Sequence, residues 1–279
     1  MDDPGVRTAL FDVAPEFATY CRAEGIMDEV AGLPYATTMF TDPLDATDHV
    51  YVVPLDPRIE QRPDVLRELA ARFAEQSLLI RTCPAAAGPS AAGFTRYLAY
   101  LVLRHPPAGE VRFPVRDVAD AEDIAFVTGL LERSYATGYA ALGSQAADRS
   151  RDYVSALGVG TDAVIAMVVT DETGRRLGHL TAVEDMRDEV TELECDEIVD
   201  VMFDEKPPSG AETSLVAAAA NRSAAGGRVL LGRVTHDHPH GPRIERRLIE
   251  TGWRPFYDVW LNRPEPELGP KTTPTRETT

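Results

Sequence analysis

Basic charge is scarce in this sequence, and the scarcity excludes whole classes of partner. The 279 residues include 28 Lys and Arg against 45 Asp and Glu, which gives a formal net charge of −17. Binding to nucleic acid or to an anionic membrane relies on a basic surface. We therefore predict no nucleic acid partner and no membrane partner, while a local basic pocket for a small anion stays compatible with the sequence.

Long hydrophobic runs and paired cysteines are missing as well. The apolar run at residues 163–169 has the length of a strand and is far shorter than the ~18 residues that a membrane span needs. The start, MDDPG, lacks the basic region of a secretory signal. Cys21, Cys83 and Cys195 form no CxxC pair, so we expect buried thiols in a reducing, cytoplasmic compartment.

Prolines and glycines predict where the chain divides. The stretch at residues 104–114, RHPPAGEVRFP, predicts a seam, and the proline-rich end from Pro264 predicts a disordered tail. The predicted domains are 1–108, 109–263 and 264–279.

The second domain shows a clear order of strand and helix signals. We expect a strand at 110–114, helices at 119–139 and 146–157, strands at 163–170, 177–185 and 190–203, an alanine-rich helix ending near 225, a strand at 228–235, a helix at 242–251 and a strand at 256–262.

This order, over residues 110–263, resembles the GCN5-related N-acetyltransferase (GNAT) superfamily. The run GGRVLLGRVTHDHPHGPRIERRLIETGWRPFYDVW is similar to the closing part of that family, in which a helix ends in Leu-x-x-x-Gly-Phe, here Leu248 to Trp253. The segments GHLTAVED and EIVDVMFD resemble its third and fourth strands. The resemblance implies an α/β (α+β) fold with a mixed, mostly antiparallel sheet flanked by helices.

The first domain is interpreted as a degenerate copy of the same unit, which implies two such units in tandem. Strand signals at 50–54 and 77–82 flank a helix signal at 62–75, with spacing close to that of the second domain. The alternative is an unrelated N-terminal cap. The loop at 55–62 has no glycine, so we expect no CoA binding in this half.

The resemblance also implies an acyl-CoA co-substrate, acetyl-CoA by default. In the family the fourth strand separates from the fifth and binds the pantetheine arm, and the next helix start receives the pyrophosphate. The residues that match these positions are Val201, Met202, Phe203, Lys206, Ser209, Gly210, Ala211 and Thr213. Ser209 and Glu212 could instead form a capping box, and Glu212 would compete with a bound phosphate.

Acyl transfer to an amine requires a base, and acidic side chains on the predicted strands are candidates. We predict Asp200 and Glu184 as catalytic; Asp200 lies among apolar neighbours, which can raise a carboxyl pKa. Strict alternation would place Asp200 on one face with Glu192 and Glu194. The family's tyrosine acid is replaced by Ile249, and Tyr257 is expected to pack.

Three of the six histidines alternate in VTHDHPHGP, as His236, His238 and His240. A continued strand would align them for a metal ion, but Pro239 and Gly241 indicate that the strand has ended. We therefore predict His236 and His238 as catalytic or substrate-orienting residues, with a metal site or a solvated loop as the alternatives.

These observations predict an acyl-CoA-dependent N-acyltransferase that acts on the amine of a small molecule; a homodimer is possible. A non-catalytic GNAT-like module that binds a ligand or partner is the alternative. A metal-dependent enzyme built on the histidine loop is a third interpretation.

Overall fold

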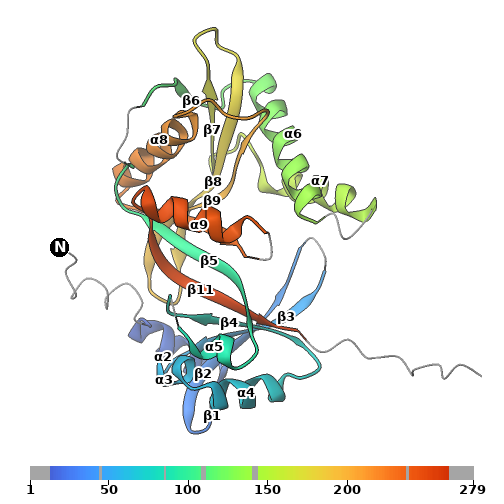
Figure 1. Ribbon diagram of the computed structural model, residues 1–279, viewed down its shortest axis with the longest axis vertical. Helices are drawn as coiled ribbons and strands as arrows, with labels where there is room; N and C mark the ends of the chain where they lie inside the picture. Colours follow the sequence, from blue (N-terminus) through green and yellow to red (C-terminus); the bar gives the residue numbers. More distant parts are fainter. Residues whose placement is uncertain are drawn as a thin grey trace, which may run out of the picture.

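The structure, a computed structural model, describes residues 13–43, 46–84, 86–107, 111–139, 144–236 and 239–263 (Figure 1). The strands of this part of the chain form a single 11-stranded sheet in the order β1-β2-β3-β4-β11-β5-β10-β9-β8-β7-β6. We call residues 13–107 the first unit and residues 111–263 the second unit.

The first unit holds five strands and four helices among its described residues. In chain order these are α2 (Pro15–Ala23), β1 (Met27–Val30), β2 (Leu33–Thr41), β3 (Asp48–Pro54), α3 (Arg58–Gln61), α4 (Pro63–Arg72), β4 (Ser77–Thr82), α5 (Gly88–Ala91) and β5 (Thr95–Leu103).

The second unit has a similar order, with one strand and one helix added at its start and a single helix where the first unit has two between its parallel strands. Its elements are β6 (Val115–Asp117), α6 (Ala121–Gly138), α7 (Ser144–Leu157), β7 (Val164–Thr170), β8 (Arg176–Asp188), β9 (Leu193–Phe203), α8 (Ala211–Ala225), β10 (Val229–Thr235), α9 (Gly241–Glu250) and β11 (Arg254–Asn262).

The pairing of the strands relates the two units by an approximate two-fold axis. Strand β3 is parallel to β4, as β9 is to β10, and all other neighbouring strands are antiparallel. The axis passes through the central antiparallel pair, β5 and β11, at Ala99 opposite Asp258. Helices α5 and α9 both precede a glycine with positive φ, Gly93 (93°) and Gly252 (103°), each followed by a buried aromatic residue. These repeats confirm the predicted tandem arrangement.

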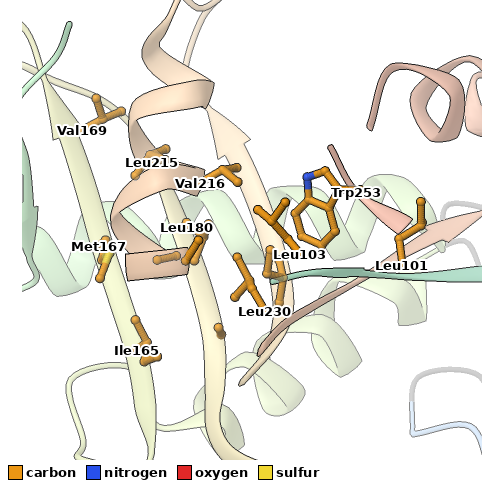
Figure 2. Packing of buried hydrophobic residues seen from close by; sticks show 14 of the residues in the cluster. Leu101, Leu103, Ile165, Met167, Val169, Leu180, Leu215, Val216, Leu230 and Trp253 are labelled. Carbon is orange, nitrogen blue, oxygen red and sulfur yellow. The ribbon is translucent and has the colours of Figure 1, made fainter. Parts of the chain in front are cut away.

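The last strands are exchanged between the units, which ties the units into one body. Strand β11 of the second unit lies beside β4 of the first, and β5 of the first lies beside β10 of the second (Figure 1). The core under α8 accordingly mixes both units: Leu101 and Leu103 of β5 pack with Leu215 of α8 and with Trp253 (Figure 2). Because fully burying a leucine contributes ~1.5–3 kcal/mol, the exchange contributes directly to the stability of both units.

The fold class predicted from the sequence is confirmed, and most element boundaries agree within a few residues. The expected strand at 110–114 is wrong: β6 begins at Val115. The third strand was expected from 190, but residues 189–192 form the turn between β8 and β9, where Glu192 has a positive φ of 62°. The predicted boundary at 108/109 and the tail at 264–279 lie outside the described residues.

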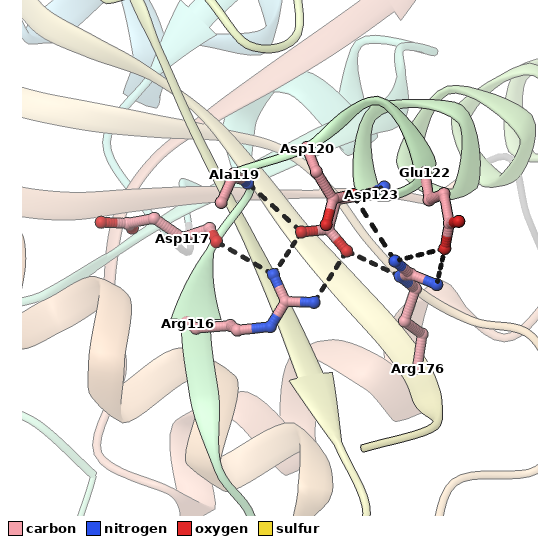
Figure 3. Close-up of polar contacts among 7 residues, drawn as sticks. All are labelled: Arg116, Asp117, Ala119, Asp120, Glu122, Asp123 and Arg176. Carbon is pink, nitrogen blue, oxygen red and sulfur yellow. Dashed lines mark hydrogen bonds and ion pairs between the residues drawn. The ribbon is translucent and has the colours of Figure 1, made fainter.

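A cluster of ions fixes the start of α6 against the sheet (Figure 3). The fully buried carboxylate of Asp123 pairs with Arg116 of β6 and accepts a bond from Arg176 Nε of β8 at 2.6 Å. Hydrogen bonds from the Arg116 guanidinium hold the pKa of Asp123 well below its usual range despite burial. The Asp120 side chain also caps the helix by accepting from the Asp123 N–H. This anchoring sets where the far end of α6 lies.

Within the described residues, no helix has the length and apolar character needed to cross a bilayer. All three cysteines are free thiols; Cys21 and Cys195 are buried and Cys83 is half-buried.

Candidate active site

A cavity of about 630 Å³ lies on the α6 face of the sheet, and both units contribute to its wall. The first unit supplies the end of β2 and parts of β3, β4 and β5. The second unit supplies the end of α6 and parts of β9, β10 and β11. A hydrogen bond from Tyr139 Oη to Asp42 Oδ2, 3.2 Å long, joins the two units across it. We call this space the inter-unit cavity.

The separation of β9 from β10 opens the sheet beside this cavity. The two strands pair only over Cys195–Glu197 and Val229–Leu231. Beyond Glu197, β9 stays paired with β8 through Phe203, but its other edge has no strand partner within the described sheet. Backbone groups on that edge have no strand to pair with, and the edge includes Val201, Met202 and Phe203, the residues predicted to bind the donor.

Asp200 faces the cavity because β9 contains a bulge. The β8–β9 register shifts between Thr181 opposite Asp200 and Ala182 opposite Ile198, which leaves Val199 without a partner. Val199 and Asp200 consequently both line the cavity, together with Glu197. The condition for Asp200 to share a face with Glu192 and Glu194, strict alternation, is not met, and Asp200 lines the cavity with Glu197.

The surroundings of Asp200 are those of a base. Burial raises the pKa of Asp200 to about 6, against weaker lowering by hydrogen bonds from Ser134 and from the Val201 N–H. Its Oδ2 has no hydrogen-bond partner among the described residues. Buried His179 lies 3.9 Å away at Nε2, and desolvation lowers the pKa of this histidine to about 4. A carboxylate that titrates near pH 6 beside a neutral imidazole can accept a proton at neutral pH.

Glu184 does not reach the inter-unit cavity. Its carboxylate pairs with Arg228 Nη2 at 2.9 Å and with Arg222 Nη2 of α8 at 3.3 Å, and it is not among the residues lining the cavity. The structure thus places it in an ion network on the α8 face.

His236 also points away from the cavity. Its Nε2 lies 3.0 Å from Glu245 Oε2 of α9, and burial, followed by the charge of Arg96, lowers the pKa of His236. Glu245 and Arg96 form a bidentate pair at 2.7 and 2.8 Å. His238 lies outside the described residues. No group of three or more His, Cys, Asp or Glu side chains within the described ranges is placed to hold a metal ion.

The start of α8 has no side-chain cap, although the Ala211 N–H is bonded to the Pro208 carbonyl at 3.2 Å. The N-cap is Gly210, with φ of 96° and no side-chain cap bond, so the Ser209–Glu212 capping box does not form. Ser209 and Lys206 are exposed, Thr213 is half-buried, and Ala211 is buried. Glu212 pairs with Arg247 Nη2 of α9 at 2.6 Å, which neutralises the charge expected to repel a phosphate. The side-chain carbons of Arg112 lie against Gly210.

Sequence reasoning missed most of the cavity wall. Five of the nine tyrosines line it: Tyr51, Tyr97, Tyr100, Tyr135 and Tyr139. They come from β3, β5, α6 and the turn that follows α6, and thus from both units, so no spacing in the sequence indicates that they meet. Arg233 of β10 was also missed, although it stands only two residues before Thr235 at the end of the strand.

No protein-family model matches the chain, and no curated protein sequence is similar to it. Solved structures do resemble it in fold. A GCN5-related N-acetyltransferase from Sphaerobacter thermophilus is 14% identical, with 83% of this chain and 77% of that chain covered and a TM-score of 0.49. A tandem GNAT protein from the clavulanic acid biosynthesis pathway is 16% identical over 84% of this chain and 79% of its own, with a TM-score of 0.41.

An aminoglycoside acetyltransferase from an uncultured soil metagenomic sample covers 50% of this chain and 91% of its own length, at 18% identity and a TM-score of 0.37. Similarity at this level carries no information about the substrate or about the role of any residue.

Proposed function

We propose that the protein is an acyl-CoA-dependent N-acyltransferase that acts on the amine of a small molecule. The observation that carries this proposal is Asp200: a carboxylate with a pKa of about 6 and an unpartnered oxygen, set in a bulge where two strands separate above a large cavity. The cavity is wide enough for a small acceptor, and the net charge of −17 favours a cationic one.

The residues at the opening between β9 and β10 fit the acyl donor. The free edge of β9 after Glu197 offers backbone groups to the amides of pantetheine. The start of α8 at Gly210, with the exposed Lys206 preceding it, offers N–H groups and positive charge to the pyrophosphate. Acyl-CoA, when bound there, supplies a thioester carbonyl as the electrophile.

Asp200 performs the first proton transfer in this scheme. Its carboxylate takes one proton from the acceptor ammonium and frees the nitrogen lone pair. The nitrogen–carbon bond then forms as the carbon–sulfur bond breaks, and the second nitrogen proton balances the departing thiolate. The Tyr135 hydroxyl, whose pKa is raised by burial, is a protonated donor in the same cavity.

Release of free CoA thiol from acetyl-CoA, measured with a panel of small amines, tests the proposal. We expect amine-dependent release by the wild-type protein and by Asp185→Asn, a control on the exposed end of β8 whose side chain is 79% exposed. Absence of release with every amine, in a protein that also fails to bind acetyl-CoA at millimolar concentration, would overturn it.

A further inference from the structure

Two arginines occupy equivalent positions in the two units. Arg81 is the fifth residue of β4, and Arg233 is the fifth residue of β10. In the registers, Arg81 lies opposite Val259 of β11 and Arg233 opposite Tyr100 of β5. The two-fold axis relates Ala99 of β5 to Asp258 of β11, so it also relates the next residues, Tyr100 and Val259. The Arg233–Tyr100 pair is therefore equivalent to the Arg81–Val259 pair.

The guanidinium of Arg81 is bound by other side chains of the protein. Its guanidinium forms a bidentate pair with Asp188, at 2.6 and 2.9 Å, and stands 3.7 Å from the centre of the Tyr257 ring. Both charged side chains are about nine-tenths buried. This is the geometry in which an arginine fork binds a planar carboxylate most strongly.

Arg233 has the same position but lacks such a partner. It lines the inter-unit cavity, and its ion pair with Glu197 measures 3.9 Å between Nη1 and Oε1, too long for a hydrogen bond. No other described carboxylate lies within 4.0 Å of it. Although protein atoms surround it, its side chain is 37% exposed to the solvent in the cavity. An aromatic ring, Tyr100, lies opposite on β5, as Tyr257 lies beside Arg81.

From this comparison we infer that Arg233 binds a carboxylate of the acceptor, in the place that Asp188 takes at Arg81. Asp200 lines the same cavity and receives the amine. The acceptor is therefore an amino acid or another small amino-carboxylic acid rather than a simple amine. This inference rests on the proposed function for the role of Asp200, while the carboxylate site rests on Arg233 alone.

Glu197 is compatible with this site. Its carboxyl group lines the cavity beside Arg233, and burial raises its pKa although the charge of Arg233 opposes the rise. The Tyr100 hydroxyl takes part in a hydrogen bond with Arg233, but the 3.9 Å contact means that Glu197 occupies none of the guanidinium N–H groups, and an incoming carboxylate can form shorter bonds there.

Matched acceptors test the inference. The twenty L-amino acids and their primary amides are compared as acceptors with acetyl-CoA, and as ligands by calorimetry with and without CoA. The amide keeps the amine and side chain but loses the carboxylate. We expect at least one acid to exceed its amide by ~10–100-fold in kcat/KM and in affinity, as charge-assisted hydrogen bonds predict.

Variants of Arg233 then locate the effect. Arg233→Gln should lower activity and affinity for the acid to the level of its amide while leaving the amide unchanged, and Arg233→Lys should restore part of the preference. Arg175→Gln, at a side chain 63% exposed on the β7–β8 turn, should behave as wild type. Thermal melting of each variant verifies that it is folded.

The outcomes separate the two proposals. Binding of an acid that depends on Arg233, without acyl transfer, supports the carboxylate site and refutes the transferase. Acyl transfer in which amides equal acids, or in which Arg233→Gln weakens both alike, refutes the carboxylate site and leaves the transferase standing. A folded protein that binds no acid, does not bind acetyl-CoA and releases no CoA thiol with any acid, amide or other amine refutes both.

Discussion

The two hairpins that approach the central strands end in different ways, and the difference determines which unit has an open site. The β8–β9 hairpin of the second unit reaches the first unit, where Asp188 pairs with Arg81 and Val190 packs on Phe17 and Cys21. Only about 30 Å³ remains there. The β2–β3 strands of the first unit reach the second unit, but they line the 630 Å³ cavity instead of filling it.

The two units also differ at the position of Asp200, the proposed base. The parallel pairs β3–β4 and β9–β10 can be aligned from their first paired residues. The third paired residue is then Tyr51 in β3 and Glu197 in β9, so these two positions correspond. The segment of β3 that follows Tyr51 reads Val52, Val53 and Pro54, without a carboxylate. The second unit thus has a carboxylate that faces the shared cavity, while the first unit has only apolar residues in the corresponding segment.

The largest expected effect comes from removing the base of the open unit. Asp200→Asn should lower kcat/KM for acyl transfer by ~10²–10⁴-fold, the usual contribution of a positioned base. In the wild type, kcat/KM should rise about tenfold per pH unit up to about pH 6 and then level, because the deprotonated carboxylate is required. Initial rates between pH 4.5 and 8.5 measure both effects.

A wild-type profile without a limb near pH 6, or an Asp200→Asn variant within threefold of wild type, would remove Asp200 from the mechanism. The control is Glu184→Gln, since that carboxylate pairs with Arg222 and Arg228 on the other face. We expect this variant to keep its activity.

We call the first unit closed, because Asp188 fills the space at Arg81, and the second unit open. Removing the Asp188–Arg81 pair should lower the free energy of unfolding and leave the rate of acyl transfer unchanged. Asp188→Ala leaves Arg81 buried without its partner, which typically costs ~3–5 kcal/mol. Glu197→Ala beside Arg233 is the matched change in the open unit and should cost no more than ~1 kcal/mol, because that pair is long and partly exposed. Urea unfolding of both variants gives the difference; equal losses would contradict the assignment of closed and open units.

The next effect is a dependence of folding stability on pH that arises from Asp200. Burial raises the pKa of Asp200 from 3.8 to about 6, so the folded state holds this proton more tightly than the unfolded chain. The resulting stability is fully present below pH 3.8 and is lost as the pH rises through 6. Relative to wild type, Asp200→Asn should therefore gain ~1–3 kcal/mol between pH 4 and pH 8, measured by urea unfolding at each pH. A gain that does not depend on pH would contradict the raised pKa.

The smallest expected effect concerns the acyl donor. Arg247→Ala exposes the charge of Glu212 at the start of α8 and should raise KM for acetyl-CoA by ~3–10-fold, as expected for a charge near a helix end. Adding Glu212→Gln to that variant should restore KM, because both charges are then gone. A KM that stays high in the double variant would show that Arg247 acts in another way.

Much of this fold was predictable because its signals are local. Hydrophobic periodicity located α6, α8 and β10 within a few residues, and the resemblance of the closing run to GNAT proteins supplied their order. The exchange of β5 and β11 was not predictable, since both strands have ordinary buried sequences and their pairing depends on contacts distant in the chain.

The site was predictable only in part, for a related reason. Asp200 stood out as a carboxylate among apolar neighbours, yet its face depended on a bulge that the sequence does not mark. His236 and Glu184 were selected for residue type. His236 instead lies against Glu245, and Glu184 forms ion pairs with Arg222 and Arg228. Arg233 and the five tyrosines could not be predicted as one site, because they come together only when the two units pack around the cavity.

The stoichiometry of acetyl-CoA binding tests the contrast between the two units most directly. Titration calorimetry with the full chain should give one molecule bound per chain, at the β9–β10 opening of the second unit. Two molecules per chain would show that the first unit is also open, and none would show that the second unit does not receive the donor; either result would contradict the account.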